Sequence, residues 1–284
     1  LVVPLATTMA LWLEVESVWW AAISGYMTIM ASGAASIQKG LLRLAGTIGG
    51  AAVGFIVARW LPYDHFALSL FLAAATMLGV VAMQVSPHGL AWLFGTITSI
   101  LVLLEGLNDP LKVPYIAFYR IFEVGIGVTA SAIVANLLMH WHADPPPQSP
   151  GWRHLLGPQW PAMLHGMRAA IAVVVMMQVW IWMDLPQVTE MAVSIAVVMS
   201  APVIGDGSLG TRHAVAERSL HRILGCFLGG IVALGCLALD VQSFPWWLAM
   251  LGASVWVGMH IQNGQHGVGY LGTQAAFVFI VTLI

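Results

Sequence analysis

The sequence predicts an all-α protein that crosses a membrane many times. Of its 284 residues, 60% are hydrophobic and 8% are charged, whereas a soluble globular domain carries about 25% charged residues. The apolar residues come in long runs and not in the strict alternation of an outer-membrane barrel. Because lipid cannot satisfy backbone polar groups, helices are the remaining solution. The composition excludes a soluble enzyme, a disordered chain and a nucleic-acid binder, which needs a basic surface.

Eleven apolar runs, separated by polar residues, Pro or Gly, predict eleven helices. The first and last runs include Leu1 and Ile284, and we expect both terminal helices to be truncated. The predicted spans cover residues 1–14, 17–32, 42–61, 66–84, 90–105, 113–139, 163–183, 187–204, 221–239, 245–261 and 268–284.

Residues 141–161 interrupt this pattern and predict the main boundary of the chain. They include three successive prolines, Pro145 to Pro147, which cannot continue a helix and favour an extended segment. We therefore divide the chain into a first transmembrane bundle (1–140), a linker (141–161) and a second transmembrane bundle (162–284). The linker is a candidate position for a soluble domain that the sequence lacks.

Lysine and arginine are unevenly distributed between the two predicted sides of the membrane. Because positive charge favours the cytoplasmic side, the linker and the loops 33–42 and 205–221 are predicted to be cytoplasmic. That side carries Lys39, Arg43, Arg153, Arg168, Arg212, Arg218 and Arg222, whereas the other side carries Arg59, Lys112 and Arg120.

The two predicted bundles carry similar motifs, which we interpret as an internal repeat. Residues 43–50 and 222–229 both read R-x-x-G-x-x-x-G. About six spans in each half would give both halves the same orientation and hence a parallel repeat. The other matches pair Trp12-Leu-Glu14 with Trp182-Met-Asp184, His88-Gly89 with His266-Gly267, and Phe94-Gly95-Thr96 with Leu271-Gly272-Thr273.

Small residues recur every four positions within and after this motif. Such a stripe lets a neighbouring helix approach closely, and this is the role that we assign to it. The alternative is that the stripe lines a path along which a substrate passes the backbone. The residues are Gly46, Gly50 and Gly54 in the first half, and Gly225, Gly229 and Ala233 in the second.

The order and duplication of these motifs resemble the fusaric acid resistance (FUSC) family of the aromatic acid exporter superfamily. That superfamily includes the p-hydroxybenzoic acid efflux subunits and the plant aluminium-activated malate transporters. The resemblance rests on R-x-x-G-T-x-x-G-x-x-x-G at residues 43–54, on Trp19-Trp20 in the first hairpin and on Gly272-Thr273-Gln274 at the start of a late span.

The resemblance implies a multi-pass exporter of small organic, often aromatic, carboxylic acids in the bacterial inner membrane. It also implies two six-helix bundles with a cytoplasmic domain between them, a homodimer and a periplasmic adaptor protein. The chain departs from this pattern in its short linker, in the missing sixth span of its second half and in Cys226, which replaces the Thr at position 47.

Arg43 and Arg222 occupy matching places at the start of predicted spans. A guanidinium can bind both oxygens of a carboxylate, and a helix N-terminus adds partial positive charge. The pair is therefore predicted to bind an anionic substrate, with anchoring to lipid headgroups as the alternative. Gln84, Gln262 and Asn263 lie in polar breaks near span ends and are further substrate-binding candidates, unless these breaks are simple turns.

Ionisable residues in or near the spans are candidates for proton coupling. Arg120 and Glu123 share one face of a helix, where they form either a structural ion pair or a proton-linked one. Glu190 is either interfacial or, at greater depth, able to carry a proton. Histidine titrates near neutral pH, and the candidates in the polar breaks are His88, His260 and His266.

No metal, cofactor or catalytic site is predicted, since the Cys and His residues lack ligand spacing and no carboxylate cluster accompanies them. The leading hypothesis is an exporter that works by alternating access between the two bundles. Its expected partners are a small organic acid, the lipid bilayer, a second copy and a periplasmic adaptor, but no nucleic acid. The alternatives are an anion channel of the malate-channel type and a membrane scaffold for a missing soluble domain.

Overall fold

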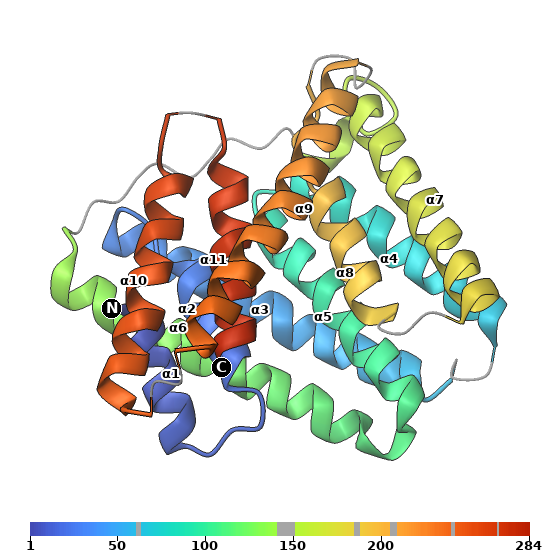
Figure 1. Cartoon of the computed structure of the whole chain (residues 1–284). Helices are drawn as coiled ribbons and strands as arrows, with labels where there is room; N and C mark the ends of the chain where they lie inside the picture. The colour runs from blue at the N-terminus through green and yellow to red at the C-terminus, as the bar shows by residue number, and fades with distance from the viewer. Residues whose placement is uncertain (61–63, 141–150, 185–187, 205–208, 240–241, 266) are drawn as a thin grey trace. The chain divides into compact units, whose positions relative to one another are not determined.

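The computed structural model describes residues 1–60, 64–140, 151–184, 188–204, 209–239, 242–265 and 267–284 (Figure 1). The predicted all-α fold is confirmed, because this part of the chain forms eleven α-helices and contains no strand. The helices are α1 (Val2–Trp12), α2 (Val18–Thr28), α3 (Gly33–Ala58), α4 (His65–Val85), α5 (Gly89–Asn108), α6 (Val113–Leu138), α7 (Trp160–Met183), α8 (Val188–Met199), α9 (Leu209–Leu237), α10 (Phe244–Gln262) and α11 (Gly269–Leu283). Two short 3₁₀ turns, η1 (Pro110–Lys112) and η2 (Trp152–His154), precede α6 and α7.

Polar residues set several helix ends. Asp64 caps α4, because its carboxylate accepts hydrogen bonds from the N–H groups of Phe66 at 3.0 Å and Ala67 at 3.1 Å. Pro161 stands in the first turn of α7, where a helix does not need its N–H. The same helix ends at Asp184, whose φ of 49° is left-handed. These helix ends therefore coincide with the polar and proline residues that separate the apolar runs of the sequence.

Seven of the helices are long and apolar enough to cross a membrane, which makes the chain a multi-pass membrane protein. The other four, α1, α2, α8 and α11, have 11, 11, 12 and 15 residues, fewer than the roughly 17 that a single span needs. The internal helices α2 and α8 are therefore shorter than the full spans expected of them, whereas α1 and α11 are the terminal helices that were expected to be truncated. The seven long helices are α3, α4, α5, α6 together with η1, α7, α9 and α10.

The chain divides into two compact units, and each unit draws on both sides of the proline-rich stretch. The predicted bundles, 1–140 and 162–284, therefore differ from these units, and the repeated two-bundle arrangement is not confirmed. The prolines of the predicted linker lie outside the described residues. Unit 1 consists of residues 1–40, 122–144 and 216–284, and unit 2 of residues 41–121 and 145–215.

Unit 2 is built around α4, which packs against α5, α7 and α8. Its main core contains Leu72, Ile100, Leu103 and Val173, whose side chains are completely buried. Since lipid tails are as apolar as leucine, close packing rather than exclusion of water holds such helices together. The fit between helix surfaces is therefore what positions any site in this unit.

Unit 1 contains two packed pairs of helices, α1 with α2 and α10 with α11. Contacts between α1 and α10, and between α2 and α11, join the pairs. Val3, Ile23, Leu251 and Ile280 form the buried centre of this core. Helices far apart in the sequence are thus packed together within the unit.

Candidate functional site: a cavity beside a buried arginine

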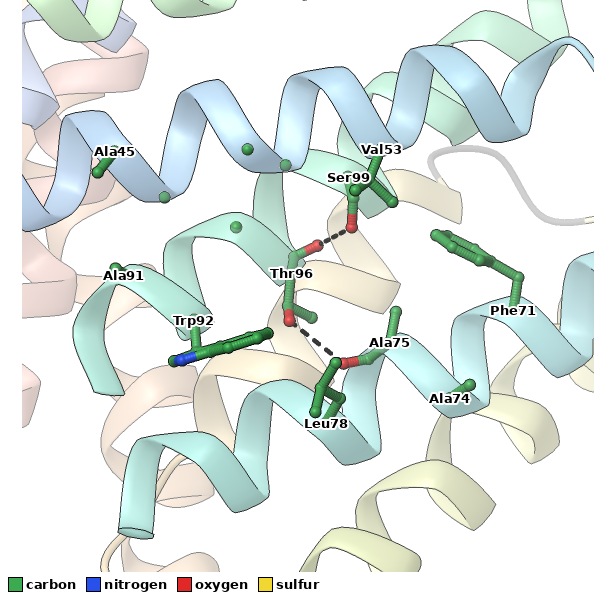
Figure 2. A pocket seen from close by; sticks show the side chains of 14 residues that line it. Ala45, Val53, Phe71, Ala74, Ala75, Leu78, Ala91, Trp92, Thr96 and Ser99 are labelled. Carbon is green, nitrogen blue, oxygen red and sulfur yellow. Dashed lines mark hydrogen bonds between the residues drawn. The ribbon is translucent and has the colours of Figure 1, made fainter. Parts of the chain in front are cut away.

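Helices α3, α4 and α5 of unit 2 line an open cavity of about 470 Å³ (Figure 2), in which Val53, Leu78 and Trp92 are exposed. The space exists because α3 presents small residues to it: Ala45, Gly46, Gly49, Gly50 and Val53. A volume of this size falls within the range of small-molecule sites in proteins, about 300–1,000 Å³.

Aromatic side chains line the cavity from the other two helices. Phe71 of α4 and Trp92 of α5 lie on either side of Thr96 in Figure 2. The Thr96 hydroxyl donates to the carbonyl of Ala75 at 3.2 Å, and the Ser99 hydroxyl donates to the carbonyl of Thr96 at 2.9 Å. Because backbone carbonyls accept both hydroxyl hydrogens, the lining is mainly apolar.

The cavity depends on the close approach of α3 to α5. A Cβ on Gly46 would collide with the backbone carbonyl of Ala91, and a Cβ on Gly50 with that of Gly95. The predicted role of the glycine stripe in close helix packing is thereby confirmed. Gly49 differs, because a Cβ there would meet nothing within 4 Å. Gly46 and Gly50 therefore set the distance between the helices, and Gly49 leaves the cavity open.

Arg43 lies on α3 just before this contact and is only 3% exposed. Its guanidinium lies over the ring of Phe94, 4.3 Å from the ring centroid. Such a contact is worth about 2 kcal/mol when it is desolvated. Phe94 precedes Gly95, which lines the cavity. The helix contact that shapes the cavity thus also holds a buried cation.

Arg120 of α6 is a second buried arginine, 7% exposed. Its Nη2 lies 3.3 Å from Oε2 of Glu105 on α5, which forms an ion pair. The sequence placed Arg120 with Glu123 because the two share a helix face, whereas Glu105 was not predicted. Ionisable groups within membrane-spanning helices are costly, which makes this pair a candidate functional group.

Arg222, the predicted counterpart of Arg43, is half-buried on α9 in unit 1. Its Nη1 donates to Oε1 of Gln274 at 2.8 Å. Neither arginine stands at a helix start, because α3 begins at Gly33 and α9 at Leu209. The argument from free N–H groups at a helix end is therefore wrong. The expected basic loops are helical in residues 33–42 and 209–221.

Gln84 holds the backbone that follows α8. Its Nε2 donates to the carbonyl of Ala201 at 3.0 Å, and its Oε1 accepts from the N–H of Val203 at 3.3 Å. His165 of α7, which is 1% exposed, makes a 2.7 Å hydrogen bond with the carbonyl of Met199. Non-helical backbone at membrane depth needs such partners. His165 was not among the predicted site residues, although it stands as an isolated histidine in an apolar run of the sequence.

The predicted polar residues at the end of α10 are exposed. Gln262 accepts a 2.9 Å hydrogen bond from the Tyr26 hydroxyl, and Asn263 ends the helix. His260 is also exposed and stacks on Trp256, with 5.8 Å between ring centroids. These three residues belong to unit 1, whereas the cavity belongs to unit 2.

The other proton-coupling candidates differ sharply in burial. Glu123 is 2% exposed, and its Oε1 accepts from the N–H of Ser17 at 3.1 Å. Glu190, in the first turn of α8, and His88, just before α5, are exposed. His266 lies outside the described residues. Among those described, no group of three His, Cys, Asp or Glu side chains is placed to hold a metal ion.

Seven long apolar helices define a multi-pass membrane protein, and its unit 2 holds a solute-sized cavity. The chain belongs to the fusaric acid resistance protein family (FUSC), whose model matches residues 2–148. This is a family of membrane transporters, and the resemblance seen in the sequence is confirmed. No curated protein and no solved structure matches the chain.

Proposed function

We propose that the chain exports small organic acids, aromatic carboxylic acids among them, across the bacterial inner membrane. Membership of the family supports transport. The choice of solute is carried by one observation: Arg43 is buried two residues before Ala45, the first residue of α3 that lines an apolar cavity with aromatic walls. An aromatic acid has a charged end and an apolar body. A guanidinium suits the carboxylate, and Phe71 and Trp92 suit the ring.

In this proposal, the anion enters from the cytoplasmic side and crosses by alternating access. Arg43 and Arg222 attract it and offset the cost of removing its charge from water. A proton gradient or the membrane potential supplies the energy. A homodimer, a periplasmic adaptor and a parallel repeat of two bundles are further parts of the proposal.

The groups that couple transport to protons are proposed among the ionisable residues. Arg120 and Glu123 are the first candidates, because both are buried. Glu190, His88 and His260 are exposed, and they suit a role at the membrane surface, where His266 is also expected. Gln84 is proposed to act on the substrate only indirectly, through the backbone that it holds.

Flux measurements in proteoliposomes test the proposal. The protein is reconstituted at pH 7.5, and efflux of radiolabelled p-hydroxybenzoate is measured against protein-free liposomes. We expect saturable efflux that a proton gradient accelerates. Loss of a charged hydrogen bond to the carboxylate costs about 1.5–3 kcal/mol, so Arg43→Gln should lower efflux at least tenfold. An equal rate in this variant would refute the role of Arg43.

Arg59→Gln is a matched control. Arg59 also lies over a phenylalanine ring, that of Phe55 at 4.8 Å, but Arg59 is exposed. We expect its variant to export at the wild-type rate. A current that does not saturate and that follows voltage alone would instead favour the channel, and no flux at all would favour the scaffold.

A further inference from the structure

The two compact units have the same pattern of helix contacts. In unit 1, α1 packs on α10 and α2 on α11. In unit 2, α7 packs on α4 and α8 on α5. In unit 1, α1 and α2 come from the first half of the sequence, and α10 and α11 from the second. In unit 2, α7 and α8 come from the second half, and α4 and α5 from the first. Each unit therefore combines the first two helices of one half with later helices of the other half.

The glycine contacts show that α3, α4 and α5 pack on one another in the same register as α9, α10 and α11. A Cβ on Gly46 would collide with the carbonyl of Ala91, and a Cβ on Gly225 would lie 2.6 Å from that of Leu271. Gly50 meets Gly95 in the way that Gly229 meets Ala275. Gly79 meets Thr96 as Gly258 meets Ala276, and Gly89 meets Met83 as Gly269 meets Gln262. A single alignment pairs α3 with α9, α4 with α10 and α5 with α11.

This alignment also pairs the two arginines and their partners. Arg43 corresponds to Arg222, and Phe94, which lies under Arg43, corresponds to Gln274, which accepts from Arg222. The last helix is shifted from the sequence-based match, because Gly95 pairs with Ala275 and not with Gly272. Contacts between neighbouring helices, and not sequence similarity, define this register.

The first helices of the two halves, α1 and α7, also end in the same backbone conformation. Glu14 follows α1 with a φ of 53°, and Asp184 follows α7 with a φ of 49°; they are the non-glycine residues of the described chain with positive φ. Trp12 and Trp182, two residues earlier in each case, are 83% and 84% exposed. Such a left-handed carboxylate residue after an exposed tryptophan is a rare local conformation.

The segments that precede α3 and α9 are each held by a hydroxyl group from the first turn of the helix. The Ser36 hydroxyl accepts from the N–H of Met30 at 2.9 Å, and the Thr211 hydroxyl accepts from the N–H of Ile204 at 2.9 Å. Each hydroxyl also donates to the carbonyl of that same residue. The correspondence thus extends over α1–α3 and α7–α9.

We infer that the two units repeat one arrangement of five helices: α1, α2 and α9–α11 in unit 1, and α7, α8 and α3–α5 in unit 2. In this exchanged plan, each half of the sequence places its first two helices in the unit that holds the later helices of the other half. We also infer that only unit 2 carries the binding cavity. The identity of the ligand rests on the proposed transport function. The small residues Ala45, Gly49 and Ser99 line the cavity in unit 2. Their counterparts in unit 1 are larger.

Larger side chains stand at the positions of the small lining residues, and a glycine stands at the position of an aromatic one. Leu224, Leu228 and Phe279 stand where unit 2 has Ala45, Gly49 and Ser99, and Phe279 is 2% exposed within the core. Gly272 stands where unit 2 has Trp92. Each chain therefore has one binding position, although the sequence repeat suggests two.

Substitutions at paired positions test the single cavity. Gly49→Leu places the residue of unit 1 into unit 2, where open space accepts it. We expect at least a tenfold weaker binding of p-hydroxybenzoate in detergent, measured by equilibrium dialysis. Gly235→Leu is the control, because Gly235 on α9 is also an open helical position. It and Leu228→Gly should bind within twofold of the wild type.

The exchanged plan is tested separately by disulfide formation in a chain in which Cys226 and Cys236 are replaced by Ala. Pro4 lies 3.3 Å from the Cβ position of Gly252, so the pair Pro4→Cys and Gly252→Cys should cross-link within one chain. The pair Pro4→Cys and Trp246→Cys should not, because Trp246 is 70% exposed on the same α10.

The binding results decide the single cavity, and the cross-linking results decide the exchanged plan. Wild-type binding by the Gly49→Leu variant, or an equal loss in Leu228→Gly, overturns the single cavity. No cross-link between positions 4 and 252 overturns the exchanged plan. Wild-type protein that binds no p-hydroxybenzoate refutes the proposed function and the ligand, while the cross-link still decides the plan.

Discussion

Two neighbouring glycines on α3 give a sharp test of how the helices are held. We predict that Gly50→Ala destabilises the protein and that Gly49→Ala does not. A Cβ at Gly50 would lie 2.8 Å from the carbonyl carbon and 2.9 Å from the Cα of Gly95, distances that real side chains essentially never show. Since these are backbone atoms, α5 itself has to move. A Cβ at Gly49 would meet nothing within 4 Å.

The two variants differ only in that contact. Both replace a glycine by alanine within the same helix, so the change in helix propensity cancels in the difference. Overpacking of a close contact costs about 1–3 kcal/mol, which we take as the expected difference in the free energy of unfolding. It corresponds to roughly a 5- to 150-fold change in the unfolding equilibrium.

Unfolding by increasing mole fractions of sodium dodecyl sulfate in mixed micelles, followed by circular dichroism, measures the difference. The Gly50→Ala transition should come at a lower mole fraction than that of Gly49→Ala, and its p-hydroxybenzoate binding should also fall. Coincident transitions would show that the close α3–α5 contact does not contribute to stability, and would refute the reasoning.

Three further outcomes follow from described contacts, all measured in the same unfolding assay unless stated. Gly229→Ala should destabilise α9 against Ala275 by about 1–3 kcal/mol, whereas Gly230→Ala, which meets only one side chain at 3.8 Å, should not; equal effects would contradict this. Asp64→Ala removes the cap of α4 and should cost about 1 kcal/mol, with Asp64→Asn close to wild type; a full loss in the Asn variant would argue against capping. Gln84→Ala removes two hydrogen bonds worth together about 1–3 kcal/mol, and hydrogen exchange should rise at residues 200–204; unchanged exchange there would show that Gln84 does not hold this segment.

The sequence predicted the helices well but missed the starts of two of them. Apolar runs located all eleven helices, because a helix core in lipid must be apolar. The starts of α3 and α9 were missed, since Lys39 and Arg212 lie in segments that hydropathy assigns to loops. A helix continues beyond the apolar region wherever its backbone bonds are satisfied, and hydropathy does not detect this.

The site was predictable only in part. Arg43 stood out as a charge at the edge of an apolar run, but its partner Phe94 depends on which face of α5 packs on α3. For the same reason, spacing along α6 could point only to Glu123 on the same helix, and it could not reveal Glu105, which pairs with Arg120 from another helix. The cavity itself is a product of close packing at Gly46 and Gly50. Single-sequence patterns describe one helix at a time and omit such contacts.

The uneven burial of the long helices bears on how the protein has to be handled. Of the most apolar stretch of α5, 61% is buried, against 17% for α9 and for α10. Large side chains such as Ile223, Phe227 and Trp246 are 65–70% exposed. In water these surfaces would aggregate. Annular lipid or long-chain surfactant has to cover α9 and α10 throughout purification, before the protein is reconstituted for flux measurements.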